Sequence, residues 1–178
     1  MKAIRWVNYA MIAAIGVMLS GGSAQGQTMP EHAHAKATLS TSLTLDVEGR
    51  ATTLSVAELR ALPQKTVIVH NAHTNTDETY SGVALSDLLA KYGAAFDKQG
   101  QKRILHSYLR VEGTDHYFVV YSGAEIQGAV HNGDVIVATT VNGKDLGDDG
   151  EIKLVASGDK KPMRWVRNLA KIALVTVN

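Results

Sequence analysis

The chain has 178 residues, of which 45% are apolar and 20% charged, with 18 basic and 17 acidic side chains and no cysteine. These values are typical of a globular chain and exclude a fibrous or disordered one. The near-neutral charge argues against nucleic acid as the main partner, because phosphate binding needs a concentrated positive surface. Without cysteine no disulfide can form, so an apolar core must stabilise the fold.

The first 26 residues have the parts of a secretory signal peptide. A basic start with Lys2 and Arg5 precedes an apolar run over residues 9–19, and small residues follow as far as Gly26. This order predicts cleavage after Gly26 and a periplasmic or secreted protein that has no membrane segment after cleavage. The apolar run is short for a membrane span, so an uncleaved anchor is the weaker alternative.

Residues 27–37 are polar and predict a flexible leader. The leader contains His32 and His34, which are either solvated or hold a soft metal weakly. Residues 38–178 then form the single predicted domain, which is long enough to bury a core.

The domain begins with strand and helix patterns. Apolar and polar residues alternate over residues 43–47, which predicts a half-buried strand, and a second short strand follows over residues 51–54. Ser55 and Glu58 have the spacing of a capping box, so a short helix is predicted that stops before Pro63.

The middle of the domain combines strands with one amphipathic helix. The β-branched run over residues 66–69 predicts a buried strand. Apolar residues then recur at helical spacing over residues 85–92, and Gly93 ends this helix. Further strands are predicted over residues 104–112 and 116–121.

The last third of the domain is predicted to be mostly strand. Ser122 and Glu125 repeat the capping-box spacing and predict a single-turn helix. Asn142-Gly143 predicts a hairpin turn. Three more strands are predicted, over residues 135–141, 151–156 and 169–177. The chain is therefore expected to be a sheet-dominated α+β domain with short inserted helices.

Three segments together resemble one protein family. They are residues 80–89 (Tyr-Ser-Gly-Val-Ala-Leu-Ser-Asp-Leu-Leu), the preceding strand with its polar tip at residues 66–73, and the closing stretch over residues 151–155 and 158–166. Their order and spacing resemble the molybdopterin-binding domain of the sulfite-oxidase-like family, in a small stand-alone exported branch. Ala84 stands where the family usually has proline.

The resemblance implies a mixed β fold that holds a molybdenum–pterin cofactor. In catalytic members a cysteine thiolate before the Gly-Val-Pro-Leu segment completes the sulfur coordination of the metal. Counting back twelve residues from Gly82 leads to His70, and this chain has no cysteine at all. Imidazole does not replace a soft thiolate, so sulfite-oxidase-type oxygen transfer is not expected. Molybdopterin remains possible as a cofactor by resemblance alone.

The polar tip at the end of the strand is the first candidate ligand site, with His70, Asn71 and His73 as binding residues. His70 and His73, with Asp77 as a third donor, could hold a metal, but a structural zinc site normally has four ligands. The alternatives are the rim of a polar pocket without metal, or loop histidines that have only local partners.

The second candidate ligand site lies at the end of the closing stretch and just after it, because five basic residues fall within the twelve positions from 160 to 171. They are Lys160, Lys161, Arg164, Arg167 and Lys171. They predict an anion site with a guanidinium fork, and by resemblance Lys161 and Arg164 lie where family members contact the pterin phosphate region. The alternative, preferred for Lys160 and Lys171, is a solvated helix face. Arg110 is a further candidate, either in the same cleft or on an exposed strand face.

No residue pattern identifies a catalytic group, so whether the chain is an enzyme stays open. The leading hypothesis is an exported binding or accessory domain for a small anion or pterin-like ligand, held between residues 70–73 and Arg164. The first alternative is a molybdopterin-dependent oxidoreductase with a non-cysteine metal ligand. The second is a scaffold or partner subunit of a periplasmic redox system, whose protein partner the sequence does not identify.

Overall fold

The computed structural model describes residues 37–72, 74–95, 100–127 and 132–177. The predicted signal peptide, all of the predicted leader except residue 37, and His73 lie outside the described residues. No helix within the described part of the chain is long and apolar enough to cross a membrane.

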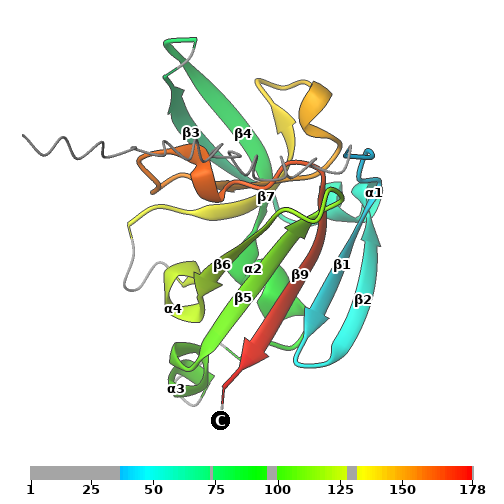
Figure 1. Ribbon diagram of the computed structural model, residues 1–178, viewed down its shortest axis with the longest axis vertical. Helices are drawn as coiled ribbons and strands as arrows, with labels where there is room; N and C mark the ends of the chain where they lie inside the picture. The colour runs from blue at the N-terminus through cyan, green and yellow to red at the C-terminus, as the bar shows by residue number, and fades with distance from the viewer. Residues whose placement is uncertain (1–36, 73, 96–99, 128–131, 178) are drawn as a thin grey trace, which may run out of the picture. The chain divides into compact units, whose positions relative to one another are not determined.

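Five strands form the first sheet, in the order β2-β1-β9-β5-β6. Figure 1 shows β9, at the end of the chain, between β1 and β5. β9 is parallel to β1 and antiparallel to β5. The strands are β1 (Ser42–Val47), β2 (Arg50–Ser55), β5 (Ser107–Gly113), β6 (Phe118–Ser122) and β9 (Leu169–Thr176).

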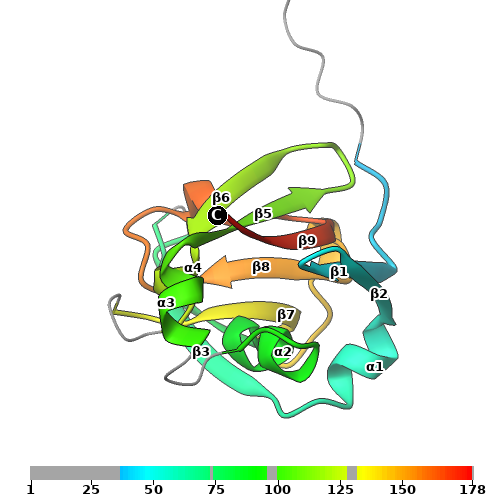
Figure 2. The same ribbon diagram turned by 90° about the horizontal axis from the view of Figure 1, so that it is seen from below.

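Four antiparallel strands form the second sheet, in the order β3-β4-β7-β8. They are β3 (Lys65–Asn71), β4 (Thr76–Ala84), β7 (Val135–Val141) and β8 (Lys153–Ala156). In Figure 2, β5, β6 and β9 lie above β7 and β8, so the sheets form two layers.

The main core lies between these layers, because each sheet buries one face against the other. Leu45, Leu109 and Ile172 of the first sheet and Val137 and Leu154 of the second are all completely buried in one cluster. A second, smaller cluster covers the other face of the second sheet. The predicted sheet-dominated α+β class is confirmed.

The helices are short and begin at local hydrogen bonds. At α1 (Val56–Arg60) and α4 (Gly123–Ile126), Ser55 and Ser122 each form the predicted capping box with the glutamate three residues later. The predicted amphipathic helix is α2 (Leu85–Lys91), which packs three leucines into the main core. The others are α3 (Gly100–Leu105) and the 3-10 turns η1 (Gly147–Asp149) and η2 (Pro162–Arg164).

Three sequence predictions were wrong in detail. The strand over residues 66–69 is not buried throughout: β3 is at the edge of its sheet and Ile68 is 67% exposed. Residues 104 and 105 belong to α3 rather than to the next strand. The basic closing stretch is not a helix face, since Lys160 lies in a bend and Lys171 in β9, although both are exposed as expected.

Candidate functional site

The β3–β4 hairpin places His70 and Asn71 on opposite faces of one strand. His70 is 57% exposed at its side chain, and its Nδ1 lies 3.0 Å from Asp77 Oδ1 on the neighbouring strand. His73 lies outside the described residues, and the described part of the chain has no group of three metal-binding side chains. The histidine that replaces the expected thiolate therefore faces away from the side of the hairpin on which Asn71 lies.

Asn71 begins a chain of hydrogen bonds on that other side of the hairpin. Its Nδ2 donates to Glu78 Oε1 at 2.6 Å, and the Tyr80 hydroxyl donates to Glu78 Oε2 at 2.8 Å. Tyr80 is buried in the second apolar cluster, whereas Asn71 and Glu78 are half-buried. A carboxylate is thus held at the boundary between an apolar surface and solvent.

Lys153 on β8 connects these hydrogen bonds to the β7–β8 loop. Its ammonium donates to the Tyr80 hydroxyl at 3.1 Å and to Asp149 Oδ2 at 2.5 Å, and the residue is only 6% exposed. A buried ammonium needs such partners, because loss of hydration is costly unless a charge is paired and hydrogen-bonded. Asn71, Glu78, Tyr80, Asp149 and Lys153 are called the Lys153 network below.

Trp165 covers the buried end of the Lys153 network. Its ring lies 5.2 Å from the Lys153 ammonium and meets the Tyr80 ring edge-to-face at 5.7 Å. The indole Nε1 donates to the Ala156 carbonyl at 3.0 Å, which fixes the ring over the sheet. Cation–π attraction adds to the packing, because the ammonium sits over two aromatic rings, those of Tyr80 and Trp165.

The surroundings set the protonation of the network. Burial acts to raise the pKa of Glu78, but hydrogen bonds from Asn71 and Tyr80 and the charge of Lys153 outweigh it and lower that pKa. Burial and the hydrogen bond to Glu78 raise the pKa of Tyr80 above its ordinary value. At neutral pH the network therefore holds an ionised Glu78 and a neutral Tyr80.

Arg164 lies in a separate cluster, where its guanidinium group is bound by two carboxylates. Nε and Nη2 donate to both oxygens of Asp159 at 3.1 and 2.6 Å, and Nη1 donates to Glu125 at 2.8 Å. The guanidinium also stacks on Tyr121, whose hydroxyl donates to the Arg164 carbonyl. Hydrogen bonds to Asp159 and Glu125 raise the pKa of Arg164. The Arg164 guanidinium, which was predicted to bind an anion, thus donates three hydrogen bonds to carboxylates of the protein itself.

Arg110 and Lys161 lie apart from that cluster. Arg110 is on the outer face of the first sheet, where it pairs with Glu112 and stacks 4.4 Å from the centre of the Phe118 ring. Lys161 is exposed just before η2, and no described residue pairs with its ammonium. The structure therefore does not gather the predicted ligand residues in one cleft.

Of the predicted ligand residues, Asn71 alone belongs to the Lys153 network. Asn71, at the polar tip, connects through the Lys153 network to Trp165 in the closing stretch. Sequence reasoning missed Glu78, Asp149 and Lys153. A signal for Lys153 was present, since it is the one charge within the apolar run from residue 152 to residue 155.

Comparison with known proteins agrees with this fold. Residues 32–176 match the family described as oxidoreductase molybdopterin binding domain, so the chain belongs to that sulfite-oxidase-like family. Ten chains of solved structures match, among them the sulfane dehydrogenase SoxCD from Paracoccus pantotrophus. The TM-score to it is 0.57 and the identity 18%, covering 75% of this chain and 37% of that chain. No curated protein matches the chain.

The residues of this chain do not fit the metal-bearing form of the family's cofactor. The sequence offers no thiolate, and His70, at the expected ligand position, is paired with Asp77 on the exposed face of the hairpin. In the closing stretch, Arg164 already binds two carboxylates. The sequence therefore lacks the soft ligand that thiolate-bound molybdenum chemistry requires.

Proposed function

We propose that this chain is an exported binding or accessory domain that holds a small anionic or pterin-like ligand without thiolate-ligated molybdenum. One observation carries the proposal. Where the family resemblance expects a thiolate, the side chain is His70, which faces away from the Lys153 network and pairs with Asp77. The signal-like residues 1–26 support export.

The exposed rim of the Lys153 network supports a ligand of this kind. Asn71, Glu78 and Trp165 are half-buried, so each retains surface that a ligand can reach. The carboxylate suits the amino and amide hydrogens of a pterin-like ring, and an indole edge or face suits its flat surface. Lys161 belongs to the same closing stretch as Trp165, and its exposed ammonium can attract an anionic substituent of the ligand.

Tryptophan fluorescence offers a direct test. Trp6 and Trp165 are the only tryptophans, so the protein cleaved after Gly26 retains Trp165 alone. Titration of the exported protein with 6-carboxypterin should quench Trp165 with saturable dependence on concentration. Glu78→Gln should weaken binding about tenfold, in line with loss of a hydrogen bond to a charged group. Asp77→Asn, on the opposite face of the same hairpin, should bind normally.

Inorganic phosphate and sulfate serve as competing probes in the same titration. If one of them displaces the pterin, the recognised feature is the anionic substituent. No quenching by 6-carboxypterin and no binding of either anion would contradict the proposal.

Metal analysis separates this proposal from the oxidoreductase alternative. Protein purified from its native periplasm should contain far less than one molybdenum atom per chain. Stoichiometric molybdenum, together with dye-linked reduction of sulfoxides or oxidation of sulfite, would instead support a molybdopterin-dependent enzyme with a non-cysteine ligand.

One surface favours the scaffold or partner-subunit alternative. Four apolar side chains on the outer face of the first sheet are between 37% and 51% exposed, namely Tyr108, Phe118, Val120 and Val175. They share this face because the strand register pairs Tyr108 with Val175, and Arg110 with Val120. Contiguous exposed apolar side chains often mark a protein contact. A fixed partner that co-purifies with the wild type but not with Val120→Lys would favour this role.

A further inference from the structure

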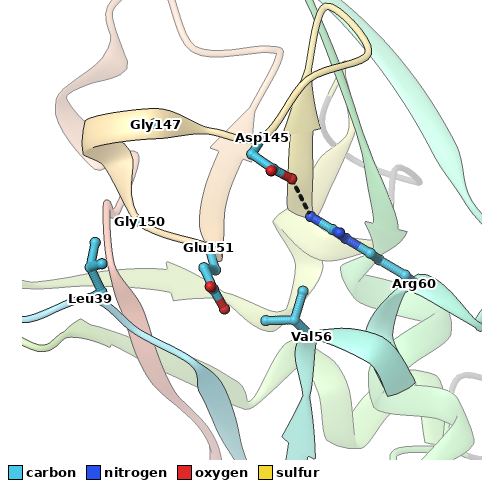
Figure 3. Close-up of a pocket in the computed structure, with 7 residues that line it drawn as sticks. All are labelled: Leu39, Val56, Arg60, Asp145, Gly147, Gly150 and Glu151. Atoms are coloured by element: carbon cyan, nitrogen blue, oxygen red, sulfur yellow. Dashed lines mark hydrogen bonds and ion pairs between the residues drawn. The ribbon is translucent and has the colours of Figure 1, made fainter.

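A cavity of about 310 Å³ is lined by residues that are not part of the Lys153 network. Figure 3 shows it between Leu39, the α1 residues Val56 and Arg60, and the β7–β8 loop with Asp145 and Glu151. Its size is at the lower end for small-molecule sites, which are commonly about 300–1,000 Å³. The cavity can therefore admit only a compact ligand.

The loop that forms one wall of this cavity is held in place by Asn168. The backbone N–H of Asn168 donates to the Asp149 carbonyl oxygen at 2.8 Å. The side-chain Oδ1 of Asn168 accepts from the backbone N–H of Ser40 at 3.3 Å. Gly150 has a φ of 91°, and a Cβ there would lie 2.2 Å from Asn168 Oδ1. Contacts within the protein therefore hold this wall of the cavity.

The charges around the cavity do not cancel. Arg60 Nη2 donates to Asp145 Oδ1 at 2.8 Å and to the Thr139 carbonyl at 3.2 Å, so its charge is already paired. No described residue pairs with Glu151, whose carboxylate extends into the space between Leu39 and Val56 in Figure 3. The lining therefore has one carboxylate more than it has basic groups.

We propose that this cavity binds a small organic cation, with its ammonium group at Glu151 and a short aliphatic part against Leu39 and Val56. A carboxylate next to apolar side chains selects for such a ligand, because the ammonium gains a charge-assisted hydrogen bond while the stem leaves water. An anion would meet Glu151 unfavourably. A bare calcium or magnesium ion needs more oxygen ligands than one unpaired carboxylate supplies.

The probes for this site are n-pentylammonium, neutral n-pentanol and pentanoate, which share one chain length. Titration of the full protein, followed by calorimetry and by amide NMR shifts of Gly147 and Gly150, should show saturable binding of n-pentylammonium only. Glu151→Gln should weaken that binding about tenfold, because it removes the charge and keeps the shape. Binding should also weaken as salt concentration rises.

Asp87→Asn is the matched control, because it removes an exposed carboxylate on α2 that does not line the cavity. It should bind n-pentylammonium as the wild type does. Equal binding of n-pentanol, unchanged binding by Glu151→Gln, or no binding at millimolar concentration would each overturn the proposal. Because the cavity and the Lys153 network share no side chain, failure here leaves the pterin titration unaffected.

Discussion

The ammonium of Lys153 lies 2.5 Å from Asp149 Oδ2, on the face of the second sheet that carries the second apolar cluster. This ion pair connects β8 to the loop that precedes it, and Tyr80 and Trp165 enclose the ammonium. The second sheet therefore encloses a charge that a hydrophobic core would normally exclude.

Removing this charge should destabilise the domain. Lys153→Ala leaves Asp149 with only the more distant Arg167, 3.7 Å away, and leaves a void below Trp165. We therefore expect the free energy of unfolding to fall by about 3 kcal/mol. Lys153→Met should recover part of the loss, since it refills the space without the charge. Urea unfolding monitored by Trp165 fluorescence measures both. A loss below about 0.5 kcal/mol for the alanine variant would show that the pair has no structural role.

Arg164 should behave as a structural residue. Its guanidinium connects the β8–β9 loop to α4 through Asp159 and Glu125. Arg164→Lys cannot keep the two-pronged contact with Asp159, so we expect a loss of about 1–2 kcal/mol. The exposed Lys161→Ala is the control and should unfold as the wild type does. If Arg164→Lys retains full stability but loses 6-carboxypterin binding, a ligand role must replace the structural one.

Stability should decrease in acid partly through Glu125. Burial acts to raise the pKa of this carboxyl, but hydrogen bonds from Ser122 and Arg164 outweigh it and lower the pKa in the folded protein. The contribution is therefore present above the ordinary pKa of 4.5 and is lost as pH falls through the lowered value. Denaturant unfolding across this pH range should show a shallower decline in Glu125→Gln. Parallel declines in the two proteins would contradict this assignment.

Gly82, the glycine of the family segment, should not tolerate a side chain. A Cβ at Gly82 would lie 2.0 Å from the Val137 carbonyl oxygen, where β4 and β7 shift register. Gly82→Ala must therefore separate two central strands, and we expect a loss of about 3 kcal/mol or no folded protein. Gly143→Ala is the comparison, because its Cβ would meet nothing within 4 Å and only its φ of 72° is strained. It should cost about 1 kcal/mol. Thermal unfolding distinguishes the two.

Local sequence patterns predicted most of the elements, because local contacts produce them. The capping boxes at Ser55 and Ser122 formed as expected, since the spacing of serine and glutamate alone determines their hydrogen bonds. Strand β4 was not predicted, and its first residues, from Thr76 to Thr79, are polar and have no apolar alternation. The exposure of Ile68 depends on the position of β3 at a sheet edge, which a single segment does not reveal.

The candidate site was harder to predict because its contacts are distant in sequence. Lys153 and Tyr80 are 73 residues apart, and Arg164 and Glu125 are 39 apart. Composition showed the basic closing stretch, but not that acidic partners would occupy Arg164. The spacing of the family segment pointed to His70 as the ligand position. Because side chains alternate between the two faces of β3, it is the next residue, Asn71, that faces the Lys153 network.

The central place of β9 has a consequence for how this domain forms. β1 and β5 have β9 between them, so neither strand has its inner partner until synthesis has passed Thr176, the last residue of β9. Pairing of β1 with β9 joins residues more than 120 positions apart, a high contact order that slows folding. A nascent chain that has not yet supplied β9 therefore presents two unpaired strand edges. Such edges favour binding by a holding chaperone, or aggregation if none is at hand.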